Sequence, residues 1–320
     1  MPAAVALIIR CFNEEAHIGR LLTGVTRQSE MPEEIIVVDS GSTDATLAIA
    51  SAFDVQLVSI APERFSFGHA LNVGIAASTA ELVVFASAHV YPLYDTWIEH
   101  LLEPFEEGTV ALTYGRQQGA PHGRFSEQRL LKHWFPEQSA RHQRHPFCNN
   151  ANAAIRRCVW EQQRYDERLT GLEDLDWAKH AMEMGHSIAY VAEAPVVHVH
   201  QEPFALVVNR YRREAIAHKE IYREQEMGLG TAVRLALVNV LGDYREAHRT
   251  RCLRRNILDI PRFRAAQFFG TYRGFMQSGP VTDVLKRRFY YPLPNGAGSG
   301  SSRGNDPGRL IDYDDPSPST

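Results

Sequence analysis

Residues 35–46 read Ile-Ile-Val-Val-Asp-Ser-Gly-Ser-Thr-Asp-Ala-Thr, and this stretch decides the fold. Its four β-branched residues in a row predict a strand buried on both faces, which ends where the polar residues begin. Asp39 therefore stands at a sheet edge. Since open parallel sheets bind ligands outside the carboxyl ends of their strands, Asp39 is a candidate ligand-binding residue. The alternative is that Asp39 and Asp44 only satisfy a turn and a helix N-terminus.

The same alternation of strand and helix extends along the chain. We expect Ser42 or Thr43 to cap a helix after Asp39, because apolar residues recur at helical spacing from Ala45 to Ala52. Over residues 5–114 the alternation predicts an α/β fold, a Rossmann-like, mostly parallel sheet with helices on both faces. The expected strands are 5–9, 35–38, 55–60, 82–86, 148–156, 187–191 and 196–199.

The predicted domain organisation follows from where this pattern changes. Residues 115–150 lose periodicity and read as a long irregular segment of the kind that is functional or mobile. Amphipathic helices follow, and the Gly/Ser-rich end cannot bury a core. We therefore expect a first domain at 1–203 (a nucleotide-sugar half 1–114 and an acceptor half 115–203), a basic helical region at 204–290 and a disordered tail at 291–320.

Composition bounds the class of protein. With 320 residues and 44% hydrophobic content, the chain can bury a sizeable core. It has no basic leader followed by an apolar segment and no run of about 18 apolar residues, so we expect it in the cytoplasm. Its four cysteines are scattered without Cys-x-x-Cys, which argues against a disulfide framework and a cysteine zinc site.

The net charge of −4 conceals an asymmetry. Residues 205–290 hold 17 Lys and Arg against 8 Asp and Glu. Such a basic region indicates an anionic partner, either lipid headgroups at the inner face of a membrane or a polyanionic acceptor, and a solvated helical face is the alternative. We expect no nucleic-acid partner. The clustered cations are Arg249, Arg251, Arg254, Arg255 and Lys286-Arg287-Arg288.

With these segments in place, the chain resembles the inverting family 2 glycosyltransferases of the GT-A fold, particularly bacterial rhamnosyltransferase-like members. Several motifs in the family's order carry the resemblance, and they extend from residue 5 to about residue 215. They are Phe12-Asn13-Glu14-Glu15, Val38 to Asp44, Gly-His-Ala-Leu-Asn-Val-Gly at 68–74, the strand end at 87–89, Asn149 to Arg156, and Gly171 to Trp177.

The resemblance implies a nucleoside diphosphate sugar as donor. Asp39 would recognise the nucleotide base, and the loop of Phe12, Asn13 and Glu14 would close over base and ribose. Leu71 stands where many relatives carry an arginine, and Arg210, Arg212 and Arg213 could replace that charge or form a solvated helix face. The other residues expected at the donor site are Ser42, His69, Asn72, Ser87 and Ala88, with a local backbone contact as the alternative for His69.

The resemblance also assigns the catalytic pair. Glu173-Asp174 would supply the general base, with Asp174 the better candidate. Inversion needs a carboxylate that takes the proton of the acceptor hydroxyl while the hydroxyl attacks the anomeric carbon, and a positive group that stabilises the departing diphosphate. The alternative for Asp174 is a helix N-cap or first-turn acid.

The metal site is where the sequence departs from the family. Ser87-Ala88-His89 occupies the place of the Asp-x-Asp motif, and His198 or His200 matches a position where related enzymes place a metal-binding histidine. Imidazole ligands favour Mn²⁺ over Mg²⁺ as the divalent cofactor. The alternative is that His89 contacts the diphosphate and catalysis needs no metal.

The sequence thus predicts an inverting glycosyltransferase that moves a sugar to a glycan or lipid-linked acceptor in surface polysaccharide biosynthesis, with possible peripheral attachment to the membrane. The rival hypothesis is an inactive glycosyltransferase-like partner or scaffold protein. A dehydrogenase is disfavoured because no Gly-x-Gly-x-x-Gly follows the first strand. A nucleotidyltransferase is disfavoured because Arg10-Cys11-Phe12-Asn13 is no triphosphate loop.

Overall fold

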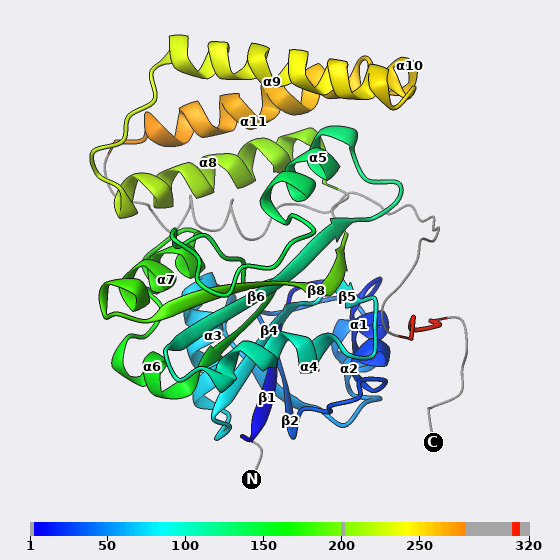
Figure 1. Cartoon of the computed structure of the whole chain (residues 1–320), viewed down its shortest axis with the longest axis vertical. Coiled ribbons are helices and arrows are strands. Elements are labelled where there is room, and N and C mark those ends of the chain that lie inside the picture. The colour runs from blue at the N-terminus through cyan, green and yellow to red at the C-terminus, as the bar shows by residue number, and fades with distance from the viewer. Residues whose placement is uncertain (1–2, 200–201, 279–308, 314–320) are drawn as a thin grey trace.

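The computed structural model describes residues 3–199, 202–278 and 309–313. Its centre is an eight-stranded sheet of order β3-β2-β1-β4-β7-β6-β8-β5 (Figure 1). The strands are β1 (Val5–Cys11), β2 (Glu34–Asp39), β3 (Gln56–Ser59), β4 (Leu82–Ser87), β5 (Val90–Pro92), β6 (Val110–Gly119), β7 (Asn152–Arg156) and β8 (Ser187–His198).

The strand directions are mixed. Strands β3, β2, β1 and β4 run parallel, as the strand-helix alternation predicts. Strand β7 is antiparallel to both β4 and β6, β8 is parallel to β6, and β5 is antiparallel to β8. The carboxyl ends of β1, β2 and β4 therefore meet at one edge, where Cys11, Asp39 and Ser87 end their strands.

Helices cover both faces of this sheet, as predicted. They are α1 (Ile18–Val25), α2 (Thr46–Ala50), α3 (Phe67–Ala76), α4 (Trp97–Leu102), α5 (Phe125–Trp134), α6 (Arg157–Gln162) and α7 (Glu173–Glu183), with 3₁₀ turns η1 (Pro62–Arg64) and η2 (Glu103–Glu106).

Alternate residues of one strand enter two different cores. Leu7 and Ile9 of β1 pack on the side of α1 and α4, whereas Ile8 packs on the side of α3, α6 and α7. Both sets are fully buried. This two-sided burial is the reason that the central strands are apolar at successive positions.

The C-terminal region is helical, as predicted. It comprises α8 (Phe204–Ile221), α9 (Leu229–Arg249), α10 (Leu253–Asn256) and α11 (Asp259–Phe275). Helix α11 lies between α8 and α9, and the three form a layer beyond the sheet (Figure 1). Among the described residues, none of the helices is long and apolar enough to span a bilayer. The predicted domain boundaries at 203 and 290 stay predictions, and Lys286-Arg287-Arg288 lies outside the described residues.

Three local predictions were wrong. The segment 115–150 is partly regular, because β6 continues to Gly119 and α5 follows it. The strands expected at 187–191 and 196–199 are one strand, β8, whose register shifts opposite Gly115 and Gln117. The residues before α2 also differ from expectation: Ser42 Oγ accepts from Asn13 N, and Asp44 Oδ1 accepts from Thr46 N, so neither Ser42 nor Thr43 caps that helix.

Part of the predicted disordered tail is packed. Ile311 donates its N–H to Leu93 O at 3.1 Å, and Tyr313 donates its hydroxyl to Pro92 O at 2.6 Å. The Arg20 guanidinium lies over both the Tyr313 and Tyr91 rings. For residues 309–313 the prediction of disorder was therefore wrong, because a short apolar and aromatic segment sits within the Gly/Ser-rich composition. The rest of 291–320 lies outside the described residues.

Candidate active site

Two loops at the sheet edge bind each other. Asn13 donates its N–H to Ser42 Oγ at 2.8 Å, and its own Oδ1 accepts from Thr43 N at 2.8 Å. Glu14 N–H donates to Thr46 Oγ1 at 2.7 Å. Asn13 has φ of 53°, a left-handed conformation that non-glycine residues adopt infrequently and that clusters at functional sites. The structure thus joins the predicted base-recognition loop, which includes Phe12, to the loop after Asp39.

The Asp39 carboxylate organises its own turn. It is 2% exposed and accepts from the backbone N–H groups of Gly41 and Ser42 at 2.9–3.2 Å. The thiol of Cys11 contacts its Oδ1 at 3.7 Å. Burial, then the Asp39 charge, raises the Cys11 pKa far above its usual value, so this thiol stays protonated. These contacts match the alternative role in a turn, and base recognition by Asp39 stays a prediction.

Helix α3 holds the segment that leads to Glu173. His69 Nδ1 lies 2.9 Å from Glu167 Oε2, and Asn72 Nδ2 donates to Tyr165 O and Glu167 Oε1, each at 2.9 Å. A Cβ built at Gly68 would lie 2.6 Å from Asp166 O, so this close approach needs glycine. The contacts account for His69 and Asn72 structurally, and their predicted donor contacts stay predictions.

The two candidate metal-binding histidines lie together. The ring of His89 stacks on that of His198 with centroids 5.0 Å apart. His89 Nδ1 lies 2.6 Å from Glu14 Oε1, and His198 Nδ1 lies 2.7 Å from Gln117 Oε1. Since both Nδ1 atoms face an oxygen acceptor, Nε2 is the ring atom that would bind a metal, the usual arrangement of metal-binding histidines.

The same region bounds what a metal site can be. Ser87 ends β4, and Ala88 is buried with its N–H donated to Arg10 O. Among the described residues no group of three or more His, Cys, Asp and Glu side chains is placed to hold a metal. A metal here would therefore rely on two imidazoles and on oxygens of the bound diphosphate. The third predicted ligand, His200, lies outside the described residues.

The predicted catalytic carboxylates begin α7. Leu172, just before them, has φ of 56°, and this left-handed residue turns the chain into the helix. Glu173 Oε1 accepts from Arg10 Nη1 at 3.2 Å. Asp174 is 8% exposed and accepts from Asn150 N at 3.2 Å and Leu175 N at 2.8 Å.

These surroundings set the ionisation of Asp174. Burial, followed by the neighbouring Glu173 charge, raises the Asp174 pKa from 3.8 to about 7, against a smaller opposing effect of the two backbone donors. A carboxylate with this pKa accepts a proton readily near neutral pH. A carboxylate that served only as a helix first-turn acid would gain nothing from such burial.

Hydrogen bonds of the adjacent residues Asn149 and Asn150 connect the base candidate to His198. Asn150 N contacts Asp174, and the preceding residue, Asn149, accepts from Gln117 Nε2 at 3.0 Å. Gln117 is 2% exposed, and its Oε1 contacts His198. Strands β6 and β8 and the start of α7 thus bring together side chains that are far apart in sequence.

The arginines of α8 differ in their environments. Arg210 lies 2.6 Å from Glu127 Oε1 and 3.1 Å from Glu202 Oε2, so two carboxylates already neutralise it. Arg212 donates to Gln277 Oε1, away from the α7 segment. Arg213 Cζ lies 4.6 Å from the Phe67 ring centroid, on the ring that Arg10 also approaches, at 5.1 Å.

Sequence reasoning missed several of these residues. Arg10 ends an apolar strand and has no motif to mark it. Gln117 falls in the segment 115–150, which we expect to be irregular, and Phe67 lies just outside the motif at 68–74. Arg213 was named with Arg210 and Arg212, but nothing in the sequence separates the three. A positive residue at a strand end, as at Arg10, is the one signal that could have been used.

Comparisons with known proteins agree with this geometry. Residues 6–163 match the model of the glycosyl transferase family 2. The chain carries a family 2 glycosyltransferase domain. This match confirms the recognition of the family predicted from the sequence.

Two relatives specify the neighbourhood in the family. The O-antigen chain rhamnosyltransferase WbaN of Salmonella anatum is 29% identical over 204 residues, which are 60% of this chain and 64% of the relative. The O-antigen chain rhamnosyltransferase RfbN of Salmonella typhimurium is 26% identical over 227 residues, 67% of this chain and 72% of the relative. The chain is therefore similar to bacterial rhamnosyltransferases, as expected. It spans just under two thirds of the length of the first relative.

Solved structures confirm the predicted GT-A fold. The mannosyltransferase PcManGT of Pyrobaculum calidifontis, in complex with GDP-Man and Mn²⁺, aligns with a TM-score of 0.58 at 17% identity and covers 91% of this chain and 88% of its own. Glucosyl-3-phosphoglycerate synthase of Mycobacterium tuberculosis, with Mn²⁺, UDP and glucosyl-3-phosphoglycerate, aligns with a TM-score of 0.52 at 21% identity, covering 71% and 82%. At these identities the likeness establishes the fold alone.

Proposed function

We propose that this chain is an inverting glycosyltransferase that moves a sugar from a nucleoside diphosphate sugar to a glycan or lipid-linked acceptor in surface polysaccharide biosynthesis, at the cytoplasmic face of the membrane. The observation that carries the proposal is Asp174. It is a buried carboxylate with a pKa of about 7, at the start of α7, and it accepts hydrogen bonds from Asn150 N and Leu175 N. The two O-antigen rhamnosyltransferase relatives support the surface-polysaccharide role.

In this proposal Asp174 takes the proton of the acceptor hydroxyl. The hydroxyl oxygen forms a bond to the anomeric carbon as the bond from that carbon to the phosphate oxygen breaks, and the nucleoside diphosphate leaves with the electron pair. Asn150 N and Leu175 N orient the carboxylate. Glu173, which is paired to Arg10, lies beside Asp174, and its charge contributes to the raised pKa of Asp174.

Arg213 and Arg10 supply positive charge for the leaving diphosphate. Both guanidiniums lie on the Phe67 ring, and a Cβ built at Gly171 would be 3.4 Å from Arg213 Nε, which places Arg213 beside the segment that leads to Asp174. Guanidinium groups bind phosphate oxygens in bidentate fashion. Arg213 is thus better suited to the role predicted for Arg210, whose charge Glu127 and Glu202 already balance.

A divalent metal fits beside these groups. His89 and His198 would hold it through Nε2, since their Nδ1 atoms contact Glu14 and Gln117. When bound, it would supply additional positive charge to the diphosphate oxygens. Burial lowers the pKa of His198 well below its usual value, so this imidazole is neutral, as a ligand must be. Imidazole ligands favour Mn²⁺ over Mg²⁺.

Calorimetric binding of UDP, GDP and dTDP, each with and without Mn²⁺, tests the donor and the metal. We expect one nucleotide to bind tightly with Mn²⁺ and the His89→Ala variant to lose the Mn²⁺ dependence. Equal affinity with and without Mn²⁺ would remove the metal from the proposal but retain the transferase. Failure of all three nucleotides to bind would favour the inactive scaffold.

A further inference from the structure

Helix α9 exposes an apolar side to solvent. Leu229, Val233, Leu237 and Leu241 are spaced four residues apart, and Val238 lies beside them on the helix. Each of these five side chains is between 50% and 59% exposed. Figure 1 shows α9 as the outermost element, with α11 between it and α8. A stripe of this kind, on a long helix at the edge of the molecule, marks an interaction surface.

The charges on this surface have one sign. Arg234 and Arg245 are about three helical turns apart and so lie on the same side of α9 as Leu237, Val238 and Leu241. Both arginines are exposed. Further exposed arginines continue this cationic side to the end of α9 and through α10; they are Arg249, Arg251, Arg254 and Arg255.

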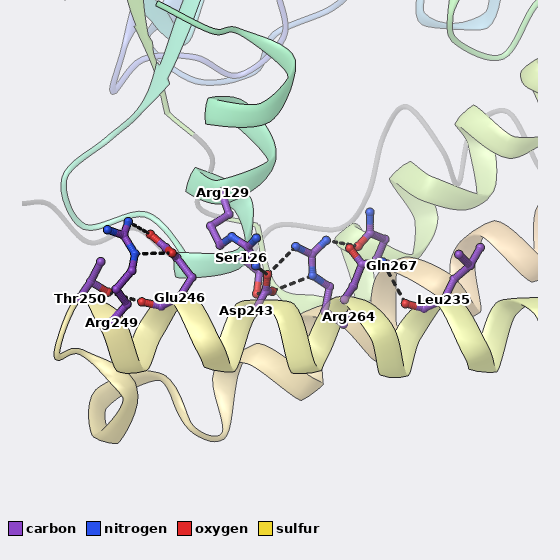
Figure 2. Close-up of polar contacts among 10 residues, drawn as sticks. Ser126, Arg129, Leu235, Asp243, Glu246, Arg249, Thr250, Arg264 and Gln267 are labelled. Atoms are coloured by element: carbon purple, nitrogen blue, oxygen red, sulfur yellow. Dashed lines mark hydrogen bonds and ion pairs between the residues drawn. The ribbon is translucent and has the colours of Figure 1, made fainter.

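Both carboxylates between residues 229 and 258 are already engaged by arginine. Asp243 is fully buried on the opposite side of α9, where it accepts from Arg264 at 2.8 and 3.0 Å and from Arg129 at 2.5 Å (Figure 2). Glu246 is paired with Arg249 at the end of the helix (Figure 2). The outward side of α9 therefore combines apolar side chains with arginines and presents no carboxylate of its own.

This composition selects the occupant. A second copy docked symmetrically on α9 would bring the same arginines against each other, and like charges across an interface cost free energy. A bilayer surface with anionic headgroups matches both properties, because an in-plane amphipathic helix buries its apolar residues among the headgroups while its arginines bind the phosphates. We propose that the outward side of α9, which we call the docking face (Val233, Arg234, Leu237, Val238, Leu241 and Arg245), binds anionic membranes.

The buried side of α9 attaches the docking face to α5. Asp243 also accepts from Ser126 at 2.5 Å, so α5 is bound to α9 by two side chains, Ser126 and Arg129 (Figure 2). The next residue of α5, Glu127, binds Arg210 of α8. Polar contacts thus join α9, which carries the docking face, to α5, and join α5 to α8. The inference deepens the proposed function, since a membrane-bound enzyme can reach a lipid-linked acceptor, and it rests on that function only for the acceptor.

Vesicle sedimentation with the full chain tests the proposal. The probes are vesicles of phosphatidylcholine alone and of equal parts phosphatidylcholine and phosphatidylglycerol, at low and at high salt. We expect binding to the anionic vesicles that weakens at high salt, because screening reduces the headgroup attraction. The Leu237→Gln/Leu241→Gln and Arg234→Gln/Arg245→Gln variants should each lose at least about tenfold in affinity for the anionic vesicles.

Matched controls separate the docking face from general effects. Arg64→Gln/Arg144→Gln makes the same change in net charge at exposed residues outside α8–α11, and Met184→Gln removes an exposed apolar side chain elsewhere; both should bind as the wild type does. Equal loss in the controls would overturn the assignment to α9, as would binding to neither vesicle. A wild-type dimer that Leu237→Gln/Leu241→Gln makes monomeric, with vesicle binding unchanged, would identify a second copy as the occupant instead. Nucleotide binding, measured in parallel, reports on the proposed function independently.

Discussion

Arg10, the penultimate residue of β1, binds Glu173, the first residue of α7, with Arg10 Nη1 3.2 Å from Glu173 Oε1. The ion pair gives two adjacent carboxylates different partners. Glu173 binds the Arg10 guanidinium, whereas Asp174 accepts hydrogen bonds from the backbone N–H groups of Asn150 and Leu175. Glu173 is therefore paired with a guanidinium, whereas burial and the Glu173 charge raise the pKa of Asp174 towards neutral pH. Their different surroundings can thus separate the roles of two like groups.

The Asp174→Asn variant should lose transfer activity. An asparagine cannot accept the acceptor proton, so kcat should fall by about 10²- to 10⁴-fold, the usual contribution of a general base. Nucleotide affinity should stay within about twofold, because Asp174 contacts no diphosphate in the proposal. Steady-state kinetics and calorimetry check the two quantities. Unchanged kcat would remove Asp174 from catalysis.

The pH profile should report the ionisation of the base. Because the wild-type base works as the anion, kcat/KM should fall about tenfold per pH unit below the Asp174 pKa of about 7. The Glu173→Gln variant removes the Glu173 charge, which is the second cause of the raised Asp174 pKa, and leaves the burial of Asp174. The acid limb of its pH profile should therefore move to lower pH. An acid limb at the same pH in both proteins would show that a different group limits the rate.

The pKa of Asp174 also predicts a stability effect. The carboxyl pKa is raised on folding, from 3.8 to about 7, so the folded state binds the proton more tightly. Stability from this group is therefore complete below the unfolded pKa and is lost as pH rises towards 7, by about 1.4 kcal/mol per unit at most. Denaturation of wild type and Asp174→Asn at pH 5 and pH 8 should show the variant gaining relative stability at pH 8. A difference independent of pH would contradict the raised pKa.

The three arginines of α8 should respond differently to loss of charge. Arg213→Gln should weaken binding of the nucleoside diphosphate by about tenfold or more, since hydrogen bonds to charged groups contribute about 1.5–3 kcal/mol. Arg212→Gln is the matched control, because its partner is Gln277, and it should bind normally. Arg210→Gln should mainly destabilise the fold by leaving Glu127 and Glu202 without their arginine. Loss of nucleotide affinity in Arg210→Gln alone would return the phosphate contact to Arg210.

The sequence predicts the sheet edge and the candidate site residues, but not the contacts around them. The strand at 35–38 and the polar residues after it predicted the sheet edge at Asp39, because burial on two faces leaves a continuous apolar run. The order of motifs predicts that His89 and Asp174 belong to one site, and this stays a prediction. The surroundings of each residue were not accessible, because a hydrogen bond such as Gln117 to His198 joins strands whose pairing no local pattern encodes.

The sequence also does not predict which side of α9 faces solvent. The arginine content of residues 205–290 predicted an anionic partner from composition alone. The sequence could not show that Asp243 turns inward to Arg264 while Leu237 and Leu241 face solvent, since all three occur in one amphipathic helix. Which side of α9 packs is decided by α11, a later element of the chain.

Gln117 should position the metal ligand His198. In Gln117→Leu the acceptor for His198 Nδ1 is lost, so the ring can turn and Mn²⁺-dependent nucleotide affinity should fall about 10- to 100-fold, the usual effect of losing such a partner. Gln117→Glu keeps an oxygen acceptor for His198 Nδ1 and should restore part of the affinity, although it loses the Nε2 donor to Asn149 Oδ1. Gln28 is another buried glutamine, and its Nε2 donates to Gly24 O and Tyr94 O. The Gln28→Leu variant therefore controls for general destabilisation. Equal Mn²⁺ dependence in Gln117→Leu would leave Gln117 a structural residue only.

Asp243 should be the main polar contributor to the attachment of α9. It is fully buried and accepts from Ser126, Arg129 and Arg264 (Figure 2). Removing one partner of a buried ion pair leaves an uncompensated charge, so Asp243→Ala should reduce the free energy of unfolding by about 3–5 kcal/mol in urea denaturation. Glu246→Ala, on the same helix, removes only the solvent-exposed pair with Arg249 and should have a much smaller effect. Equal losses in the two variants would mean that apolar packing of α9 on α11, rather than the Asp243 cluster, holds the helix in place.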